Sequence, residues 1–283
     1  MFYKPRYYFE YNDVKINILD TPGHKDFAED TFRTLTAVDS VILVIDCANG
    51  VEEQTKRLME VCRMRKTPVI IFINKMDREG QNPFDLLDEL EQKLGISVRP
   101  LTWPINMGQN FKGVYNLMEK SLNLFSANKT KIEKEVVAVD IDSAELDTRV
   151  GERDANQLRE DVELIDGVYE PFDRNDYLSG DIAPVFFGSG VNNFGVMEVL
   201  DALVDLAPAP KPRTSNLLVN KQPVVKEIQP EDSAFSGVVF KVQANMDANH
   251  RDRIAFVRMA SGKYTPGMKL KVQRTGKELR PTS

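Results

Sequence analysis

Short apolar runs alternate with charged stretches of helical spacing along most of the chain. Three runs are apolar at almost every position, at 41–46, 69–74 and 184–187. Such runs are typical of parallel strands that are covered on both faces. Apolar residues recur at helical spacing in three further stretches, which predicts helices over 51–65, 83–94 and 196–206. Strands that alternate with helices predict an α/β layer fold with a mostly parallel sheet and right-handed crossovers.

Turn and cap signals refine this picture at two places. The stretch 7–20 holds two strand-like runs on either side of Asn12-Asp13, a pair that favours a tight hairpin turn. The predicted helix over 83–94 has Asn82 before it as a candidate N-cap. Its first turn holds Pro83, where a missing backbone N–H costs nothing.

The alternation breaks at about 107–181, which we interpret as an inserted subdomain with a strand over 135–141 and a polar helix over 151–165. The proline-rich stretch 207–215 is predicted to be a linker. Three short strands follow it, at 237–243, 254–259 and 269–273. The expected organisation is therefore an α/β domain over 1–206, the linker, and the opening of a β-barrel over 216–283.

Composition limits the class of protein. Apolar residues make up 42% of the 283 positions, which is enough for a packed core. No apolar run approaches the roughly eighteen residues of a membrane span, and residues 1–8 lack the apolar core of a signal peptide. The two cysteines, Cys47 and Cys62, are not in a metal-like pair. These features favour a cytoplasmic protein with reduced thiols.

Charge is unevenly distributed around a net value of −6. Residues 131–181 carry 16 acidic and 6 basic side chains, which is most simply a solvated surface. Residues 241–283 carry 10 basic and 3 acidic side chains. This basic tail is a candidate for contact with a polyanion such as RNA, although charge alone leaves a solvation role equally open.

The first candidate site is Asp20-Thr21-Pro22-Gly23-His24, which lies between an apolar strand and a helical stretch. Ligands bind at such junctions in doubly wound folds. The Asp20 carboxylate can hold Mg²⁺ through water, and the Gly23 amide can reach a terminal phosphate because no side chain blocks it. The His24 ring can orient a water for in-line attack. A polar turn that only joins strand to helix is the alternative.

The second candidate site is Asn74-Lys75-Met76-Asp77, directly after the apolar run 69–74. A carboxylate such as that of Asp77 can accept both the ring N–H and the exocyclic amine of guanine, a pair that adenine does not offer. The Lys75 stem can lie along the base, and the Asn74 amide can tie neighbouring loops together. An ordinary charged loop is the alternative.

A third, weaker signal is Gly188-Ser189-Gly190, which follows the run 184–187 and can bring a backbone N–H to the guanine oxygen. It can equally be a flexible turn. His250 has no cysteine or second histidine near it in the sequence, and Trp103 is expected to pack in the interior, so neither is assigned a ligand.

These motifs, in this order, resemble the translational GTPases, which have a P-loop-NTPase-type GTP-binding domain. Several flanking stretches resemble the release factor three family in particular: FAEDTFRTLTAVD at 27–39, RPLTWPI at 99–105, FFG at 186–188, NFGV at 193–196 and FKVQANMD at 240–247. The similarity runs from about Tyr8 to the end. An elongation factor G-like translocase is the nearest rival within the same class.

The resemblance implies that the chain binds GTP and GDP with Mg²⁺ and hydrolyses GTP to GDP and phosphate, with His24 as the catalytic residue. It implies nucleotide contacts from the three motifs, namely Asp20, Thr21, Pro22, Gly23, His24, Asn74, Lys75, Asp77, Gly188, Ser189 and Gly190. It also implies a role in translation termination, in which the factor ejects the stop-codon-reading release factor from the ribosome. The expected partners are ribosomal RNA, ribosomal proteins and those release factors, with neither membrane nor DNA among them.

One part of the family pattern is missing from these residues. No G-x-x-x-x-G-K-[ST] occurs, and the Gly-Lys pairs at Gly262 and Gly276 are followed by Tyr264 and Glu278. The family's first strand and first switch are not found either. We therefore expect a piece truncated at both ends that is inactive alone. A pseudo-GTPase that binds guanine nucleotide or the ribosome without chemistry is the alternative.

Overall fold

The computed structural model describes residues 8–21, 28–125, 136–219, 222–244 and 253–281. These residues form two compact units, one made of Met1–Ala28 with Ser40–Ala207 and the other of Glu29–Asp39 with Pro208–Ser283. Among the described residues, no helix combines the length and the apolar character needed to cross a bilayer.

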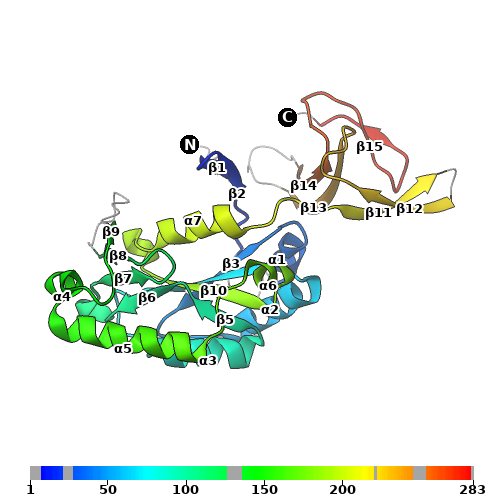
Figure 1. Cartoon of the computed structure of the whole chain (residues 1–283). Helices are drawn as coiled ribbons and strands as arrows, with labels where there is room; N and C mark the ends of the chain where they lie inside the picture. Colours follow the sequence, from blue (N-terminus) through cyan, green and yellow to red (C-terminus); the bar gives the residue numbers. More distant parts are fainter. Residues whose placement is uncertain (1–7, 22–27, 126–135, 220–221, 245–252, 282–283) are drawn as a thin grey trace. The chain divides into compact units, whose positions relative to one another are not determined.

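A four-stranded parallel sheet is the centre of the first unit (Figure 1). Its strands lie in the order β3, β4, β10, β5, with bounds Val41–Asp46, Val69–Asn74, Ile182–Phe187 and Ser97–Pro100. All three pairings are parallel. The apolar runs of the sequence are thus strands of one sheet, as predicted, whereas the short strand β5 was not predicted.

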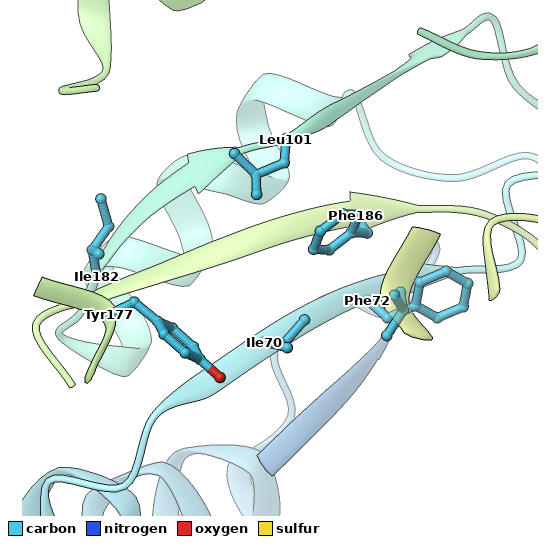
Figure 2. Packing of buried hydrophobic residues seen from close by; sticks show 7 residues of the cluster. Ile70, Phe72, Leu101, Tyr177, Ile182 and Phe186 are labelled. Carbon is cyan, nitrogen blue, oxygen red and sulfur yellow. The ribbon is translucent and has the colours of Figure 1, made fainter. Parts of the chain in front are cut away.

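Helices cover both faces of this sheet. They are α2 (Glu53–Arg65), α3 (Pro83–Leu94), α6 (Arg174–Ser179) and α7 (Val196–Leu206). The α3 helix begins as the sequence predicts, since the Asn82 side chain accepts a hydrogen bond from the Phe84 N–H at 2.9 Å and Pro83 occupies the first turn. One buried cluster joins β4, β10, α6, α7 and the residue that follows β5. Its members are Ile70, Phe72, Leu101, Tyr177, Ile182, Phe186 and Val199 (Figure 2).

The predicted insert is a second sheet with its own helices. Strands β6 (Thr102–Ile105), β7 (Gly113–Asn116), β8 (Ser121–Leu124) and β9 (Val136–Ala138) pair antiparallel in chain order. Helices α4 (Ala144–Val150) and α5 (Glu152–Val168) follow them. The sheet begins at Thr102, earlier than the expected start near 107, because Thr102 pairs with Asn116 across the first hairpin. Trp103 is buried, and its ring N–H donates to Asp161, which fits the packing role expected for it.

The predicted hairpin forms a sheet of its own rather than joining the central one. Strands β1 (Tyr8–Tyr11) and β2 (Val14–Asn17) pair antiparallel, with positive φ at Asn12 and Asp13 in the turn. The Tyr11 hydroxyl donates to Asp201 on α7 at 2.6 Å. This hydrogen bond is the main reason why the pKa of Tyr11 rises to about 12.

The outer edge of the central sheet is unusually apolar. Among the described residues, β3 pairs only with β4. Its side chains Ile42 and Val44 are 37% and 57% exposed. An edge strand that is apolar up to its last residue is an arrangement that soluble proteins generally avoid, because it invites pairing with another strand.

The second unit holds three two-stranded antiparallel sheets and a helix from an earlier part of the chain. The strands are β11 (Arg213–Val219), β12 (Gln222–Ile228), β13 (Ser236–Ala244), β14 (Arg253–Ser261), β15 (Leu270–Lys271) and β16 (Glu278–Leu279). The first of these strands begins within the predicted linker. The helix α1 (Ala28–Leu35) clusters with these strands from Glu29 onwards.

One contact within that grouping is a two-pronged interaction between an arginine and a carboxylate. The Arg258 guanidinium binds the Asp39 carboxylate through two nitrogens, at 2.7 and 2.9 Å, and donates to the Ala37 carbonyl at 3.1 Å. Arg213 approaches the same carboxylate at 3.9 Å. Such a two-pronged arginine–carboxylate contact is strong and directional, so it fixes the segment after α1 against the strands of this unit.

Candidate functional site

The carboxyl ends of β3, β4 and β10 bring together most of the residues that the sequence singles out in the first unit. Asp46, the last residue of β3, lies in register with Asn74, the last residue of β4, and β10 pairs with β4 up to Phe187. The loops that leave these strands are therefore neighbours. Ligands of doubly wound sheets bind at this edge.

The Asn74 side chain connects two of these loops. Its Oδ1 accepts hydrogen bonds from the Lys75 N–H and the Gly190 N–H, both at 2.8 Å. The Met76 N–H also donates to the Gly188 carbonyl at 3.0 Å. The loop after β4 and the small-residue loop after β10 are thus joined by backbone and side-chain contacts, as the sequence suggests for an asparagine at this place.

Lys75 is fixed at both its backbone and its side chain. It has a positive φ of 70°, which few non-glycine residues adopt. Its Nζ lies 2.5 Å from Asp46 Oδ2, and its carbonyl accepts from the Cys47 thiol at 3.2 Å. The hydrogen bond from Lys75 is the main cause that lowers the pKa of Asp46. Burial is the main cause that raises the pKa of the Cys47 thiol, so the thiol remains a neutral donor.

Asp77 carries the most informative feature of this edge. Its Oδ1 is buried and has no hydrogen-bond partner among the described residues. Buried carboxylate oxygens nearly always have a partner, because leaving one unsatisfied is costly. The described residues therefore leave an acceptor after β4 whose hydrogen bond a ligand donor would complete, and the guanine contact expected of Asp77 stays a prediction.

The loop after β10 is tightly packed rather than flexible. Ser189 is fully buried, and its hydroxyl accepts from the Asn192 amide at 2.9 Å. The turn closes through two backbone hydrogen bonds of 3.0 Å between Ser189 and Phe194. A short 3₁₀ helix, η3 (Gly190–Asn192), lies within this turn. The loop is therefore preorganised. The backbone N–H groups of Gly188, Ser189 and Gly190, one of which the sequence predicts for the guanine oxygen, donate instead to Ile73, Phe194 and Asn74.

Gly188 offers a direct test of that packing. A Cβ at this position would lie 2.3 Å from the Phe194 carbonyl oxygen and 2.8 Å from the Phe72 ring. We expect Gly188→Ala to lower the free energy of unfolding by about 1–3 kcal/mol, as overpacking in a rigid core does. Urea unfolding followed by circular dichroism measures it. Gly167→Ala in α5 is the matched control, since its Cβ would meet nothing within 4 Å. It should be neutral or stabilising by up to about 1 kcal/mol, and equal losses in both variants would contradict the packing argument.

The motif that is predicted to contact the phosphates, 20–24, is described only in part. Asp20 and Thr21 follow β2, with Asp20 exposed and Thr21 half-buried. Pro22, Gly23 and His24 lie outside the described residues, as does His250. Among the residues that the structure does describe, no cluster of three histidine, cysteine or acidic side chains could hold a metal ion. The roles predicted for this motif therefore stay predictions.

A separate hollow lies at the other end of the central sheet. Its volume is about 540 Å³, and it is lined by residues at the C-terminal ends of α2, α3 and α6, including Lys66, Gly95 and Gly180. It adjoins the amino-terminal ends of β5 and β10 through Ser97 and Asp181. None of the predicted site residues lines it, so we do not assign it to the candidate site.

Three comparisons with known proteins bear on this site. Residues 4–209 match the family of the elongation factor Tu GTP binding domain, and residues 234–282 match elongation factor G domain 2. Over 276 residues, or 97% of its length, the chain is 51% identical to peptide chain release factor 3 of Nitrosomonas europaea. The chain spans about half (50%) of that relative.

The fold also resembles a solved structure. A crystal structure of a Thermus thermophilus protein matches with a TM-score of 0.67 over 96% of this chain and 39% of its own, at 20% identity. At that identity the likeness concerns the fold alone. Together with the two family matches, it confirms the predicted P-loop-NTPase-type α/β domain followed by β-structure of a second domain.

Proposed function

We propose a function from one premise: this chain belongs to the family of GTPases that share the elongation factor Tu GTP binding domain. Its proposed activity is to bind guanine nucleotide within a translation termination factor that uses GTP to eject the stop-codon-reading release factor from the ribosome. The observation that carries the proposal is the buried, unpartnered Asp77 Oδ1 at the carboxyl edge of the sheet. The 51% identity to a release factor 3 supports the termination role.

Guanine recognition is the best supported part of this function. In the proposed complex the Asp77 carboxylate accepts the ring N–H and the exocyclic amine of guanine. The Lys75 stem lies along the base. The backbone N–H groups of Gly188, Ser189 and Gly190 donate to Ile73, Phe194 and Asn74, so this loop supports the site without a free backbone donor for the guanine oxygen. Asn74 holds the two loops together through its contact with Gly190. Adenine would leave the buried carboxylate oxygen unsatisfied, which is a strong basis for discrimination.

The phosphate half is proposed from sequence alone. Asp20 would hold Mg²⁺ through water, since a carboxylate oxygen suits this ion, and Mg²⁺ would neutralise charge on the phosphates. Thr21 and Pro22 would shape the turn, the Gly23 amide would face the terminal phosphate, and His24 would orient the attacking water.

Without a phosphate-binding loop, the residues 20–24 can supply only part of the phosphate contacts that GTP hydrolysis needs. No G-x-x-x-x-G-K-[ST] occurs in the 283 residues. Among the described residues, β3 pairs only with β4, and one face of β3 is uncovered at Ile42 and Val44. We therefore propose that this chain binds guanine weakly and hydrolyses GTP slowly. The lack of a phosphate-binding loop also favours a second candidate function, a module that binds guanine nucleotide or the ribosome without hydrolysing GTP.

Ribosome contact is proposed for the basic tail over 241–283, in keeping with a cytoplasmic translation factor. The test is Lys271→Gln with Lys277→Gln, which removes two exposed charges. Affinity for purified ribosomes, measured by sedimentation at several salt concentrations, should fall. The slope of log affinity against log salt should flatten by about 1–2 units, because each phosphate contact contributes about 0.7–0.9.

The matched control is Arg57→Gln with Arg153→Gln, which removes two exposed charges from the first unit. It should leave both the affinity and the salt slope unchanged. If the tail variant and the control behave alike, the positive charge of 241–283 serves solvation only and the ribosome-facing assignment fails.

A further inference from the structure

Asp46 occupies a fixed position beside the residues that the proposed function assigns to guanine. It ends β3 in register with Asn74, so its carboxylate lies next to the loop that follows β4. One oxygen, Oδ1, accepts the Ala48 N–H at 2.9 Å. The other, Oδ2, contacts Lys75 Nζ at 2.5 Å. Both carboxylate oxygens are thus engaged, one by its own loop and the other by Lys75.

Lys75 is correspondingly constrained along its whole length. Its N–H donates to Asn74 Oδ1, its carbonyl accepts from the Cys47 thiol, and its ammonium group meets Asp46. The Cys47 N–H in turn donates to the Asn74 carbonyl at 3.0 Å. The lysine stem therefore has a set direction across the carboxyl ends of β3 and β4 before any ligand is present. A free lysine side chain would have to lose much rotamer freedom to adopt one direction.

We propose that Asp46 is a positioning residue for guanine recognition, which holds Lys75 in the orientation where its stem can lie against a flat purine. The proposal rests on the proposed function, because it concerns the same site. Asp46 acts through Lys75 and does not contact the base itself. Asp46 contributes to affinity because it orders the Lys75 side chain in advance. The loss of rotamer freedom of Lys75 then does not weaken the binding step.

A purely structural role makes a different prediction. The side chains of Lys75 and Asp46 are 43% and 21% exposed, and ion pairs with this access to water contribute little to folding stability. Asparagine at position 46 keeps an oxygen for the Ala48 N–H and loses only the charge. Loss of stability and loss of guanine affinity can therefore be measured as separate effects.

The experiment titrates the 283-residue chain with GDP and with guanosine, at millimolar concentrations, by ligand-observed NMR. Asp46→Asn should weaken both ligands by a similar factor of about two- to tenfold, because the affected contact is to the base they share. The unfolding midpoint should stay unchanged. Glu53→Gln is the control, since it removes the partner of Lys56 in an exposed ion pair that involves none of the residues assigned to guanine. It should leave both affinities at the wild-type value.

A double-mutant cycle tests whether Asp46 acts through the lysine. In a Lys75→Met background, Asp46→Asn should cause no further loss, whereas independent effects would multiply. Asp46→Glu, which keeps the charge, should recover part of the affinity. An unchanged affinity in Asp46→Asn, a multiplicative cycle, or a large fall in its unfolding midpoint overturns the proposal.

The proposed function fails separately. If the wild-type chain does not bind guanine nucleotide at these concentrations, both the function and this inference are wrong. If the wild-type chain binds and Asp46→Asn binds equally well, only the inference about Asp46 is wrong.

Discussion

Asp77→Asn should convert a chain that prefers guanine into one that prefers xanthine. Xanthine carries an oxygen where guanine has its exocyclic amine, so it needs a donor where guanine needs an acceptor. The asparagine amide supplies that donor and keeps one oxygen for the ring N–H. Guanine would lose charge-assisted hydrogen bonds of about 1.5–3 kcal/mol each, so its affinity should fall by roughly 100-fold. Xanthosine diphosphate should bind more tightly to the variant than to the wild-type chain.

Competition between GDP and xanthosine diphosphate, followed by ligand-observed NMR, measures this switch. Asp88→Asn on α3 is the matched control, because it neutralises an exposed carboxylate on the same unit. It should keep the wild-type base preference. An Asp77→Asn variant that is folded by circular dichroism and still prefers guanine would remove the main support for the proposed function.

GTP hydrolysis by this chain alone should be close to the uncatalysed rate. Phosphoryl transfer depends on positioning and on stabilising charge at the phosphates. A phosphate loop would supply a cradle of backbone N–H groups, a lysine for the outer phosphates and a hydroxyl for Mg²⁺. Each missing donor typically costs about 10²–10³ in rate, and several are missing together. Phosphate release, measured with and without ribosomes, should therefore remain at background.

Alanine variants of the two histidines of the chain test whether any measured hydrolysis comes from the predicted catalytic site. At background turnover, His24→Ala and His250→Ala should both match the wild-type chain. Ribosome-stimulated turnover that is lost in His24→Ala and kept in His250→Ala would show that the catalytic site is complete. In that case the expectation drawn from the missing loop is wrong.

Much of the central sheet could be predicted because its signals are local. The strands β3 and β4 are wholly apolar until their last residues, and α3 has its own cap at Asn82. The four-residue strands of the insert were harder to predict. Strand β6 is buried at every position yet contains Pro104. It is a strand because its four residues pair with those of β7, up to Asn116. A pattern within a few residues does not reveal such pairings.

In the candidate site too, residues with a local sequence signal could be predicted, whereas contacts that depend on strand pairing could not. Asn74 and Asp77 could be identified because they directly follow an apolar run, where the edge of a parallel sheet must lie. The ion pair between Asp46 and Lys75 could not, since it depends on the register of β3 against β4. The sequence signal for Asp46 was only its place at the end of a run. The grouping of α1 with the second unit and the contact between Arg258 and Asp39 carried no local signal either.

The contact between Arg258 and Asp39 has a practical consequence for anyone who wishes to cut the protein into pieces. The chain enters the second unit at Glu29, leaves it after Asp39 and returns at Pro208, so the two units are interleaved along the sequence. A protease that cleaves near 208 would leave Asp39 on one fragment and the strands on the other, so the contact between Arg258 and Asp39 would become one between two fragments. A gene shortened at the same point would instead yield an α/β domain whose Asp39 has lost both of its arginines.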